Sequence, residues 1–441
     1  MRNIFLLSLL LVISFSVIGQ KSQKPKLIAG PVVGSVTKNS AKIWIAYRGQ
    51  GNNMLILGDT AEKRVYYPTS ANSITDEKGN IALTMEFTGL KPDHKYNIII
   101  SIDGWGAHAR YSFKTQSDTA VKDFNFLLGS CSLLQTDITQ GVFPGGSNWI
   151  FYYMKRKKGD FMVWLGDNVY YLYKKHWSSY EGMFKRNLKI RKTYNHFYRD
   201  LLATTPNYAM WDDHDYGPND ADGTFALKDT ALLVFKNFWP NTYPENENVK
   251  GNFFNFKYYD TEFFMTDGRY YREKAGDSAS AMLGEKQMLW LKNKLMFSDA
   301  SFKFICLGTQ ILTANAFGET YMEYMKERNE LLDFIADNNI KGVIFLTGDK
   351  HFSEISALNW KGYPMYDITC SPLTSPTLPR RLLGAYKNDN RVPKSDFGFK
   401  NFGRISLSGE AGNRVAKLEF IDQTGVKKRE FTIRAGELQK K

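Results

Sequence analysis

Cysteine is scarce in this chain, which has three in 441 residues: Cys131, Cys306 and Cys370. An odd number leaves at least one thiol without a partner in the same chain, and so few exclude a small fold held together by disulfides. Cys306 lies in the apolar stretch 302–307, which predicts a buried strand where cysteine is a small apolar residue. Cys131 has small polar neighbours on both sides and requires another explanation.

Long apolar runs are also missing, with one exception near the start. Residues 4–18 carry no polar side chain except serine, follow the charge of Arg2, and give way to polar sequence after Gly19 and Gln20. This pattern predicts a signal peptide over 1–19, hence export to the periplasm or outside the cell, with no transmembrane anchor after cleavage. About fifteen residues are short for a membrane span, and an uncleaved anchor is the alternative. The leader has no twin-arginine pair.

Acidic residues are fewer than basic ones, so the formal net charge is +13 with histidine neutral. Such a balance favours anionic partners, which include nucleic acids, membrane surfaces and phosphorylated substrates. The lysines and arginines are scattered, with clusters only at 155–158 and 427–429. No stripe alternates arginine with aromatic residues, as a nucleic-acid channel requires. We therefore expect no specific nucleic-acid partner. The sequence makes no prediction of oligomeric state.

The patterning changes near residue 120 and predicts two domains. Residues 25–116 contain short alternating strands separated by turns, typical of a β-sandwich. The turn at 89–92 before Tyr96 resembles a fibronectin type III corner, in which the tyrosine hydroxyl fixes a loop. From 121 to 441, strands alternate with amphipathic helices, which indicates an α/β layered fold. The predicted helical segments are 147–157, 180–203, 224–238, 284–297 and 320–338, and 373–400 is predicted as a loop.

Four apolar strands of the second region end in polar clusters. The clusters are Gly129-Ser130-Cys131-Ser132, Gly166-Asp167, Asp212-Asp213-His214-Asp215 and Gly348-Asp349-Lys350-His351. In layered α/β folds, ligands gather outside the carboxyl ends of the strands. One such end is weak evidence, because Gly-Asp also begins ordinary turns. Four ends that offer a thiol, carboxylates and histidines predict a shared site.

The side chains in these clusters suit metal ions. Asp167 and Tyr170 are three residues apart, so a helical turn would direct both oxygens to one point, although a helix cap and a packing tyrosine are the alternative. The carboxylates around His214 would repel one another without a cation, unless they form a solvated turn. In an extended segment, Asp349 and His351 would face one site while Lys350 points elsewhere. Two metal ions fit better than one, because a pair can clamp both oxygens of an in-line phosphoryl transfer.

These motifs and their order resemble the alkaline phosphatase D (PhoD-like) metallophosphatases. The resemblance covers nearly the whole mature chain and includes the fibronectin-like domain. It implies a four-layer αββα fold and hydrolysis of phosphomonoesters or phosphodiesters by a metal-activated hydroxide. It also implies a centre of ferric iron and calcium, with other divalent metals possible. A phosphate ester is thus the expected substrate.

The resemblance also implies roles for individual residues. The ferric ligands would be Cys131, Asp167, Tyr170 and Asp349. Asp167 would bridge to calcium, whose further ligands would be Asp213, Asn219 and His351. His214 would act as general acid or phosphate stabiliser. Arg269 and Arg272 would bind the substrate phosphate, with a structural ion pair as an equal alternative.

Two features depart from the family, and other functions stay open. Asp215 stands where many members have glutamate. Because the leader lacks the twin-arginine pair, metal loading would follow export. The alternatives are a phospholipase or diesterase specialised for lipids or polymers, and a non-catalytic metal-binding surface protein. A nucleic-acid binder would rest on net charge alone.

Overall fold

The computed structural model describes residues 26–49, 53–102, 105–134, 149–193, 195–243, 249–277, 279–315 and 318–441. The predicted signal peptide over 1–19 lies outside these residues. Within these ranges, no helix is both long and apolar enough to cross a bilayer.

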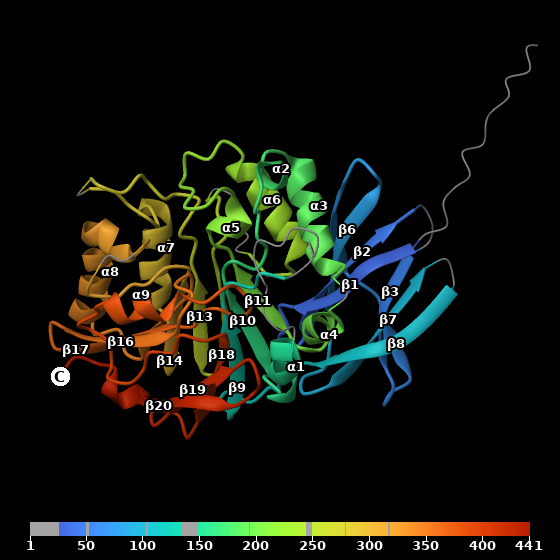
Figure 1. Cartoon of the computed structure of the whole chain (residues 1–441). Coiled ribbons are helices and arrows are strands. Elements are labelled where there is room, and N and C mark those ends of the chain that lie inside the picture. Colours follow the sequence, from blue (N-terminus) through green and yellow to red (C-terminus); the bar gives the residue numbers. More distant parts are fainter. Residues whose placement is uncertain are drawn as a thin grey trace, which may run out of the picture.

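Three sheets organise the described chain (Figure 1). The largest has ten strands in the order β20-β19-β18-β9-β10-β11-β1-β2-β6-β5, the second has six in the order β12-β13-β14-β15-β17-β16, and the third has four in the order β4-β3-β7-β8. The N-terminal strands are β1 (Lys26–Gly34), β2 (Ser40–Arg48), β3 (Asn53–Asp59), β4 (Arg64–Tyr66), β5 (Ser70–Thr75), β6 (Asn80–Thr88), β7 (Lys95–Ile102) and β8 (Trp105–Lys114). The remaining strands of the ten-stranded sheet are β9 (Phe124–Gly129), β10 (Phe161–Leu165), β11 (Asn207–Met210), β18 (Asn401–Ser408), β19 (Val415–Asp422) and β20 (Lys427–Arg434). The six-stranded sheet consists of β12 (Phe254–Tyr258), β13 (Thr261–Met265), β14 (Phe302–Leu307), β15 (Val343–Thr347), β16 (Glu354–Trp360) and β17 (Tyr363–Thr369).

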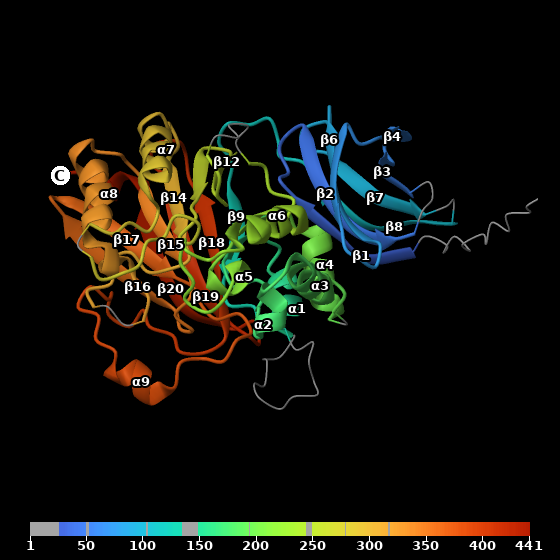
Figure 2. The ribbon, with the colours of Figure 1, turned by 90° about the horizontal axis from the view of Figure 1, so that it is seen from above.

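The helices form the outer layers of the second region (Figure 2). They are α1 (Trp149–Arg156), α2 (Lys174–Trp177), α3 (Tyr180–Arg191), α4 (His196–Thr204), α5 (Asp213–Tyr216), α6 (Lys228–Phe238), α7 (Glu285–Met296), α8 (Met325–Asp337) and α9 (Arg380–Ala385), with short 3-10 turns at Tyr321–Tyr324 and Ala435–Glu437. Helices α7 and α8 lie outside the six-stranded sheet, whereas α1, α3, α4 and α6 lie outside strands β9 to β11. This order confirms the predicted mixed α/β fold.

Strand β10 shows why the central strands read as unbroken apolar sequence. All five of its residues are buried. Phe161, Val163 and Leu165 pack in the core between the two large sheets, whereas Met162 and Trp164 pack beneath the helices. Because alternate side chains point to opposite faces and both faces are covered, every position is apolar. The strand ends where the predicted Gly166-Asp167 cluster begins.

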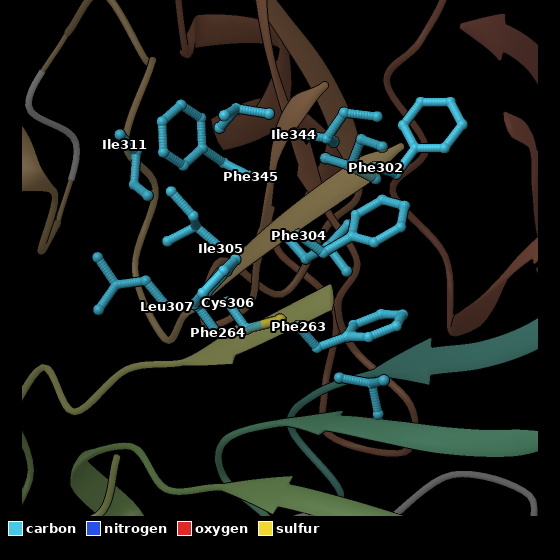
Figure 3. Packing of buried hydrophobic residues seen from close by; sticks show 14 of the residues in the cluster. Phe263, Phe264, Phe302, Phe304, Ile305, Cys306, Leu307, Ile311, Ile344 and Phe345 are labelled. Atoms are coloured by element: carbon cyan, nitrogen blue, oxygen red, sulfur yellow. The ribbon is translucent and has the colours of Figure 1, made fainter. Parts of the chain in front are cut away.

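The core between the two sheets is rich in phenylalanine (Figure 3). Phe263 stacks on Phe304 with ring centroids 5.0 Å apart. Cys306 is fully buried in the same cluster. The thiol lies among apolar side chains, which confirms the prediction that Cys306 is a small core residue.

The N-terminal strands form two facing sheets with a common core. Ile43 and Phe87 from one sheet and Leu57 and Tyr96 from the other belong to this core. The Tyr96 hydroxyl accepts a hydrogen bond of 2.7 Å from the backbone N–H of Lys91, as the corner motif predicts. The fibronectin type of this unit remains a prediction.

The sheet of the N-terminal unit continues into the second region. Strand β1 runs parallel to β11, with Gly34 opposite Asn207. The Asn207 amide donates to the Val33 carbonyl at 2.9 Å, and the Trp44 indole donates to the Asn237 carbonyl at 2.7 Å. The sheet therefore crosses the predicted domain boundary without a break.

One predicted helix is divided in two. The segment expected as a single helix over 180–203 forms α3 and α4, because Asn195 caps a new helix by accepting from the backbone N–H of Tyr198 at 3.2 Å. The predicted loop over 373–400 contains the short helix α9.

Candidate active site

The four predicted strand ends converge at one edge of the two large sheets. The backbone N–H of Cys131, after β9, donates to the Gly166 carbonyl, after β10, at 3.2 Å. Gly166 has a φ of 97°, and a side chain there would collide with Asp212. A side chain at Gly348, after β15, would lie 2.6 Å from the Leu165 carbonyl. Glycine therefore permits the close approach of chain segments that brings the clusters together.

A first group of metal-ligand atoms joins Cys131, Asp167 and His351, whose donor atoms lie within 4.8 Å of one another. The Cys131 thiol lies 3.6 Å from Asp167 Oδ2. The Tyr170 hydroxyl donates to the same oxygen at 3.1 Å. A sulfur, a phenol oxygen, a carboxylate and an imidazole thus surround one point.

A second group shares Asp167 and adds Asp213 and His214, again within 4.8 Å. The backbone N–H of His214 donates to Asp167 Oδ1 at 3.3 Å and to Asp213 Oδ1 at 2.9 Å. The imidazole ring lies against Tyr170, with centroids 4.3 Å apart. Asp167 therefore belongs to both groups, as a bridging ligand would.

A third group extends the site to Asp220 and Glu319, which lie within 4.8 Å of Asp213 by their donor atoms. The backbone N–H of Asp220 donates to Asp213 Oδ2 at 2.8 Å. Sequence reasoning missed Glu319, because this residue lies on the loop between β14 and α8 and does not directly follow an apolar strand.

Two serines that the sequence did not indicate support the ligands. The Ser371 hydroxyl donates to Cys131 Sγ at 3.2 Å, and the Ser375 hydroxyl donates to Tyr170 Oη at 2.8 Å. Both serines follow β17, and Ser375 lies in the predicted loop over 373–400; serine is too common in such segments to signal a role.

The backbone of the site is strained. The φ angles of Cys131, Asp167, Asp349 and His351 are 56°, 56°, 66° and 58°, all in the left-handed region. Each such residue costs on the order of 1–3 kcal/mol and persists only where the surrounding structure holds it. The concentration of strain at the strand ends marks these residues as a functional cluster.

Crowded acidic groups dominate the electrostatics. Burial raises the pKa of Asp167 well above its usual range, and the charges of Asp213 and Asp212 raise it further. Burial and the charge of Asp167 also raise the pKa of the Cys131 thiol. Burial outweighs the charge of Arg269 and raises the pKa of Asp212 to about 8. For Asp213, the charges of His214 and Arg269 outweigh burial and lower the pKa to about 2.

These residues fit a centre of metal ions. His214 Nδ1 and Asp212 Oδ2 are buried and have no hydrogen-bond partner among the described residues. A thiolate and several carboxylates gathered in a buried place need positive charge to remain anionic. Metal ions supply that charge, and the mixture of sulfur and oxygen donors suits a transition metal beside a harder cation.

The structure places Asp349 differently from the other predicted ligands. Its backbone carbonyl lies 3.5 Å from Cys131 Sγ, while its carboxylate lies 3.3 Å from the Lys350 ammonium. The prediction that Lys350 points elsewhere is wrong, because the side chain is buried and also donates to the Glu319 carbonyl. The segment is not extended, so the alternation of a strand does not apply.

Asn219 and the two arginines complete the predicted set. Asn219 is exposed beside Asp220. Arg269 and Arg272 are buried and both pair with Glu319, while Arg269 Nε also donates to Asp212 at 2.6 Å. Their arrangement is that of the structural ion pair, the alternative that the sequence left open. Phosphate binding by the arginines remains a prediction.

The fold and the site define a metallophosphatase. A family model described as PhoD-like phosphatase matches residues 126–418, which is more than half of the chain. The chain belongs to the PhoD-like phosphatase family.

Solved structures agree with this fold. The structure of PhoD is similar over 93% of this chain and 90% of that chain, with 16% identity and a TM-score of 0.72. The purple acid phosphatase PPD1 from yellow lupin (Lupinus luteus) seeds is similar over 92% of this chain and 74% of that chain, with 12% identity and a TM-score of 0.66. At these identities the likeness concerns the fold alone. Comparison with curated protein sequences finds no match.

Proposed function

We propose that this protein is an exported phosphoesterase that hydrolyses phosphomonoesters or phosphodiesters at a centre of ferric iron and calcium. The observation that carries the proposal is the sharing of Asp167 by two groups of donor atoms, one with Cys131 and one with Asp213. Such sharing is what a bridged metal pair requires. When bound, the metals would supply Lewis acidity toward the phosphate and lower the pKa of water.

The chemistry of the side chains assigns them to two proposed metal sites. Cys131 and Tyr170 are buried and offer a thiol and a phenol beside Asp167, and the high charge of ferric iron would stabilise both groups as anions. Asp213 and Asp220 offer carboxylates at the more open side, which suits calcium. Half-buried Asp349 and exposed Asn219 would complete these shells by local rearrangement of their side chains.

His214 is the group best placed to act on the substrate. Its backbone N–H bonds fix the residue against Asp167 and Asp213, and its ring lies against Tyr170. Nδ1 has no partner within the described chain. A histidine so held beside the ligands can donate a proton to the leaving oxygen or a hydrogen bond to the phosphate.

Elemental analysis together with phosphatase assays tests the proposal. Purified protein should contain a transition metal and calcium and should hydrolyse p-nitrophenyl phosphate. Prolonged treatment with a strong chelator should remove the metals and the activity together, and metal addition should restore both. Full turnover by metal-free protein would rule out the proposed chemistry. Metal content without turnover on monoesters or diesters would favour a non-catalytic binding protein.

The export part of the proposal rests on the leader sequence. An apolar run after Arg2 that ends at a small residue, Gly19, is typical of a cleaved signal peptide. N-terminal sequencing of the protein recovered from outside the cytoplasm should begin near residue 20. An intact Met1 on protein retained in the cytoplasm would refute it.

A further inference from the structure

The segment 371–375, which follows β17, places two serine hydroxyls against two of the proposed ferric ligands, and its interpretation rests on the proposed function. Ser371 and Ser375 are fully buried. The Ser371 hydroxyl lies 3.2 Å from Cys131 Sγ, and the Ser375 hydroxyl lies 2.8 Å from Tyr170 Oη. A thiol and a phenol are ordinarily neutral near pH 7, so these two ligands are the ones that must become anions to bind a ferric ion.

Backbone hydrogen bonds hold this segment against the residues that follow β9. The backbone N–H of Leu373 donates to the Ser130 carbonyl at 2.8 Å. The backbone N–H groups of Thr374 and Ser375 donate to the Cys131 carbonyl at 3.2 and 3.1 Å. The main chain of the segment is therefore fixed to the main chain of the sulfur ligand, and the serine side chains start from defined positions beside it.

The hydrogen bonds around Ser371 direct its proton to Cys131. Ser371 Oγ accepts from the backbone N–H of His351 at 3.0 Å, which leaves its own hydrogen to donate to the sulfur. Ser130 Oγ also lies 3.5 Å from Cys131 Sγ, but it lies closer, at 3.0 Å, to the Cys370 carbonyl. Ser371 thus provides the nearest hydroxyl donor to the sulfur among the described residues. It also joins Cys131 to His351, which belongs to the same group of donor atoms.

The Ser375 hydroxyl is directed to Tyr170 in a similar way. Within the described chain, its only hydrogen bond is the one to Tyr170 Oη. The Tyr170 hydroxyl itself donates to Asp167 Oδ2 at 3.1 Å. When Tyr170 gives up this proton to bind a metal ion, the Ser375 donor stays in place and lies against the phenolate oxygen, where it fixes the orientation of the ligand.

Both hydrogen bonds lie away from solvent, because Cys131 is fully buried and Tyr170 is nearly so. A hydrogen bond to an anion in such a place is stronger than in water, since the local dielectric constant is low. It also draws electron density away from the atom that accepts it. A sulfur or oxygen ligand with such a partner donates less strongly to its metal ion, and hydrogen bonds to sulfur ligands are known to tune metal centres in this way.

We propose that Ser371 and Ser375 are positioning residues that hold the thiolate of Cys131 and the phenolate of Tyr170 toward the ferric ion and limit their electron donation to it. The ion then keeps more of its positive charge for the phosphate, as a Lewis acid requires. Without either hydroxyl, a buried anion loses a donor that nothing else replaces, so the ion is bound less tightly.

Visible absorption of the iron-loaded protein tests the electronic part of this assignment. Thiolate and phenolate ligands give ferric iron charge-transfer bands, and the energy of each band falls as the ligand donates more strongly. Ser375→Ala should therefore shift the phenolate band to longer wavelength, and Ser371→Ala should do the same to the thiolate band. Tyr170→Phe removes the phenolate and so identifies its band. Each serine is tested separately, so that one variant decides the outcome if the other fails to fold.

Thr374→Val is the matched control, because it removes a third buried hydroxyl from the same segment. The Thr374 hydroxyl donates to the Leu133 carbonyl at 2.9 Å and to no metal ligand. All three variants lose one buried hydrogen bond, so urea should unfold their metal-free forms at similarly lowered concentrations. Only the two serine variants should shift a band. Equal shifts in Thr374→Val, or unshifted bands in both serine variants, would overturn the assignment.

Titration of the metal-free protein with cobalt(II), which also binds thiolates, keeps this inference separate from the proposed function. Loss of a hydrogen-bond partner of a metal ligand costs about 10- to 100-fold in affinity, so Ser371→Ala should raise the Kd for cobalt(II) by that factor, and Thr374→Val should not. If the wild type hydrolyses no ester, the proposed function fails, while the cobalt titration still decides the role of Ser371. Equal Kd values in the wild type and Ser371→Ala would exclude that role even if turnover is high. A wild type that binds neither iron nor cobalt would refute both.

Discussion

Two groups of carboxylates lie next to each other in this protein, and they are neutralised in different ways. Glu319 is held by Arg269 and Arg272, so the chain itself supplies the positive charge. Burial raises the pKa of Asp167, and the charges of neighbouring carboxylates raise it further. The first group is complete as a structural unit, whereas the second becomes electrically balanced only with metal ions. The comparison therefore distinguishes a structural group around Glu319 from a reactive group around Asp167.

The largest effect is expected from Asp167, because both metal groups share this residue. Asp167→Ala should abolish metal binding and reduce kcat/KM by on the order of 10³-fold or more, since a metal contributes several kcal/mol to phosphoryl transfer. Elemental analysis and p-nitrophenyl phosphate turnover measure the two effects. Asp118→Ala, at an exposed pair with Lys38, is the control and should change neither. Full metal content in Asp167→Ala would show that the ligands are misassigned.

A comparable loss, but in stability, is expected at Glu319. Glu319→Gln removes the carboxylate that two buried guanidinium groups share and leaves only Asp212 beside Arg269 and Glu323 beside Arg272. This should lower the free energy of unfolding by about 1.5–3 kcal/mol. Urea unfolding of the metal-free protein isolates this effect from any loss of metal. Glu62→Gln, at an exposed pair with Lys91, should cost less than about 1 kcal/mol. A wild-type unfolding midpoint in Glu319→Gln would mean that the arginines find other partners.

The sequence predicted the part of the site that is encoded locally. Strand β10 reads as five apolar residues because both of its faces are covered, and Asp167 follows in the tight turn that Gly166 allows. Glu319 was not predicted, because nothing near it in sequence reveals that two distant arginines hold it beside Asp213. The buried position of Lys350 was missed for a similar reason, since the left-handed backbone on either side of it is imposed by tertiary contacts.

The same limit applies to the fold. The strands of the N-terminal unit were visible as alternating patterns, and the role of Tyr96 followed from its corner. The pairing of β1 with β11 joins residues far apart in sequence, and a local pattern does not specify the neighbour of an edge strand. The continuous ten-stranded sheet therefore emerged only from the structure.

His214 sharpens the comparison, because it lies at the metal site and the proposed function directs it toward the substrate. His214→Ala should retain bound metal while kcat falls by about 10²-fold, the usual scale for a general acid. The loss should be smaller for p-nitrophenyl esters, whose leaving group needs little protonation, than for alkyl esters. His196→Ala, at the exposed start of α4, is the matched control. A wild-type kcat of His214→Ala on alkyl esters would exclude the proposed role of His214 as general acid.

The smallest expected effect is a change in the free energy of unfolding of the metal-free protein. Its sign should be opposite for substitutions in the two carboxylate groups. Asp167→Asn removes a carboxyl group whose ionisation is opposed by burial and by its neighbours. It should therefore stabilise the metal-free protein by about 1–2 kcal/mol at pH 8, where Glu319→Gln destabilises it. Because the folded-state pKa of Asp167 is raised, the folded protein binds a proton that the unfolded chain has released above about pH 4. The wild-type metal-free protein should accordingly lose stability as the pH rises from about 5 to 8.

Two neighbouring carboxyl groups should contribute to the same dependence of stability on pH. The raised pKa values of Asp215, to about 7, and Asp212, to about 8, act in the same direction as that of Asp167. In Asp167→Asn, stability should fall less with rising pH than it does in the wild type. The difference in free energy of unfolding between the two proteins should shrink toward pH 5. Metal-loaded protein should show the opposite trend, because the ligands bind metal in their deprotonated forms. Parallel pH profiles for the metal-free and metal-loaded proteins, measured by urea unfolding, would contradict the view that metals balance this cluster.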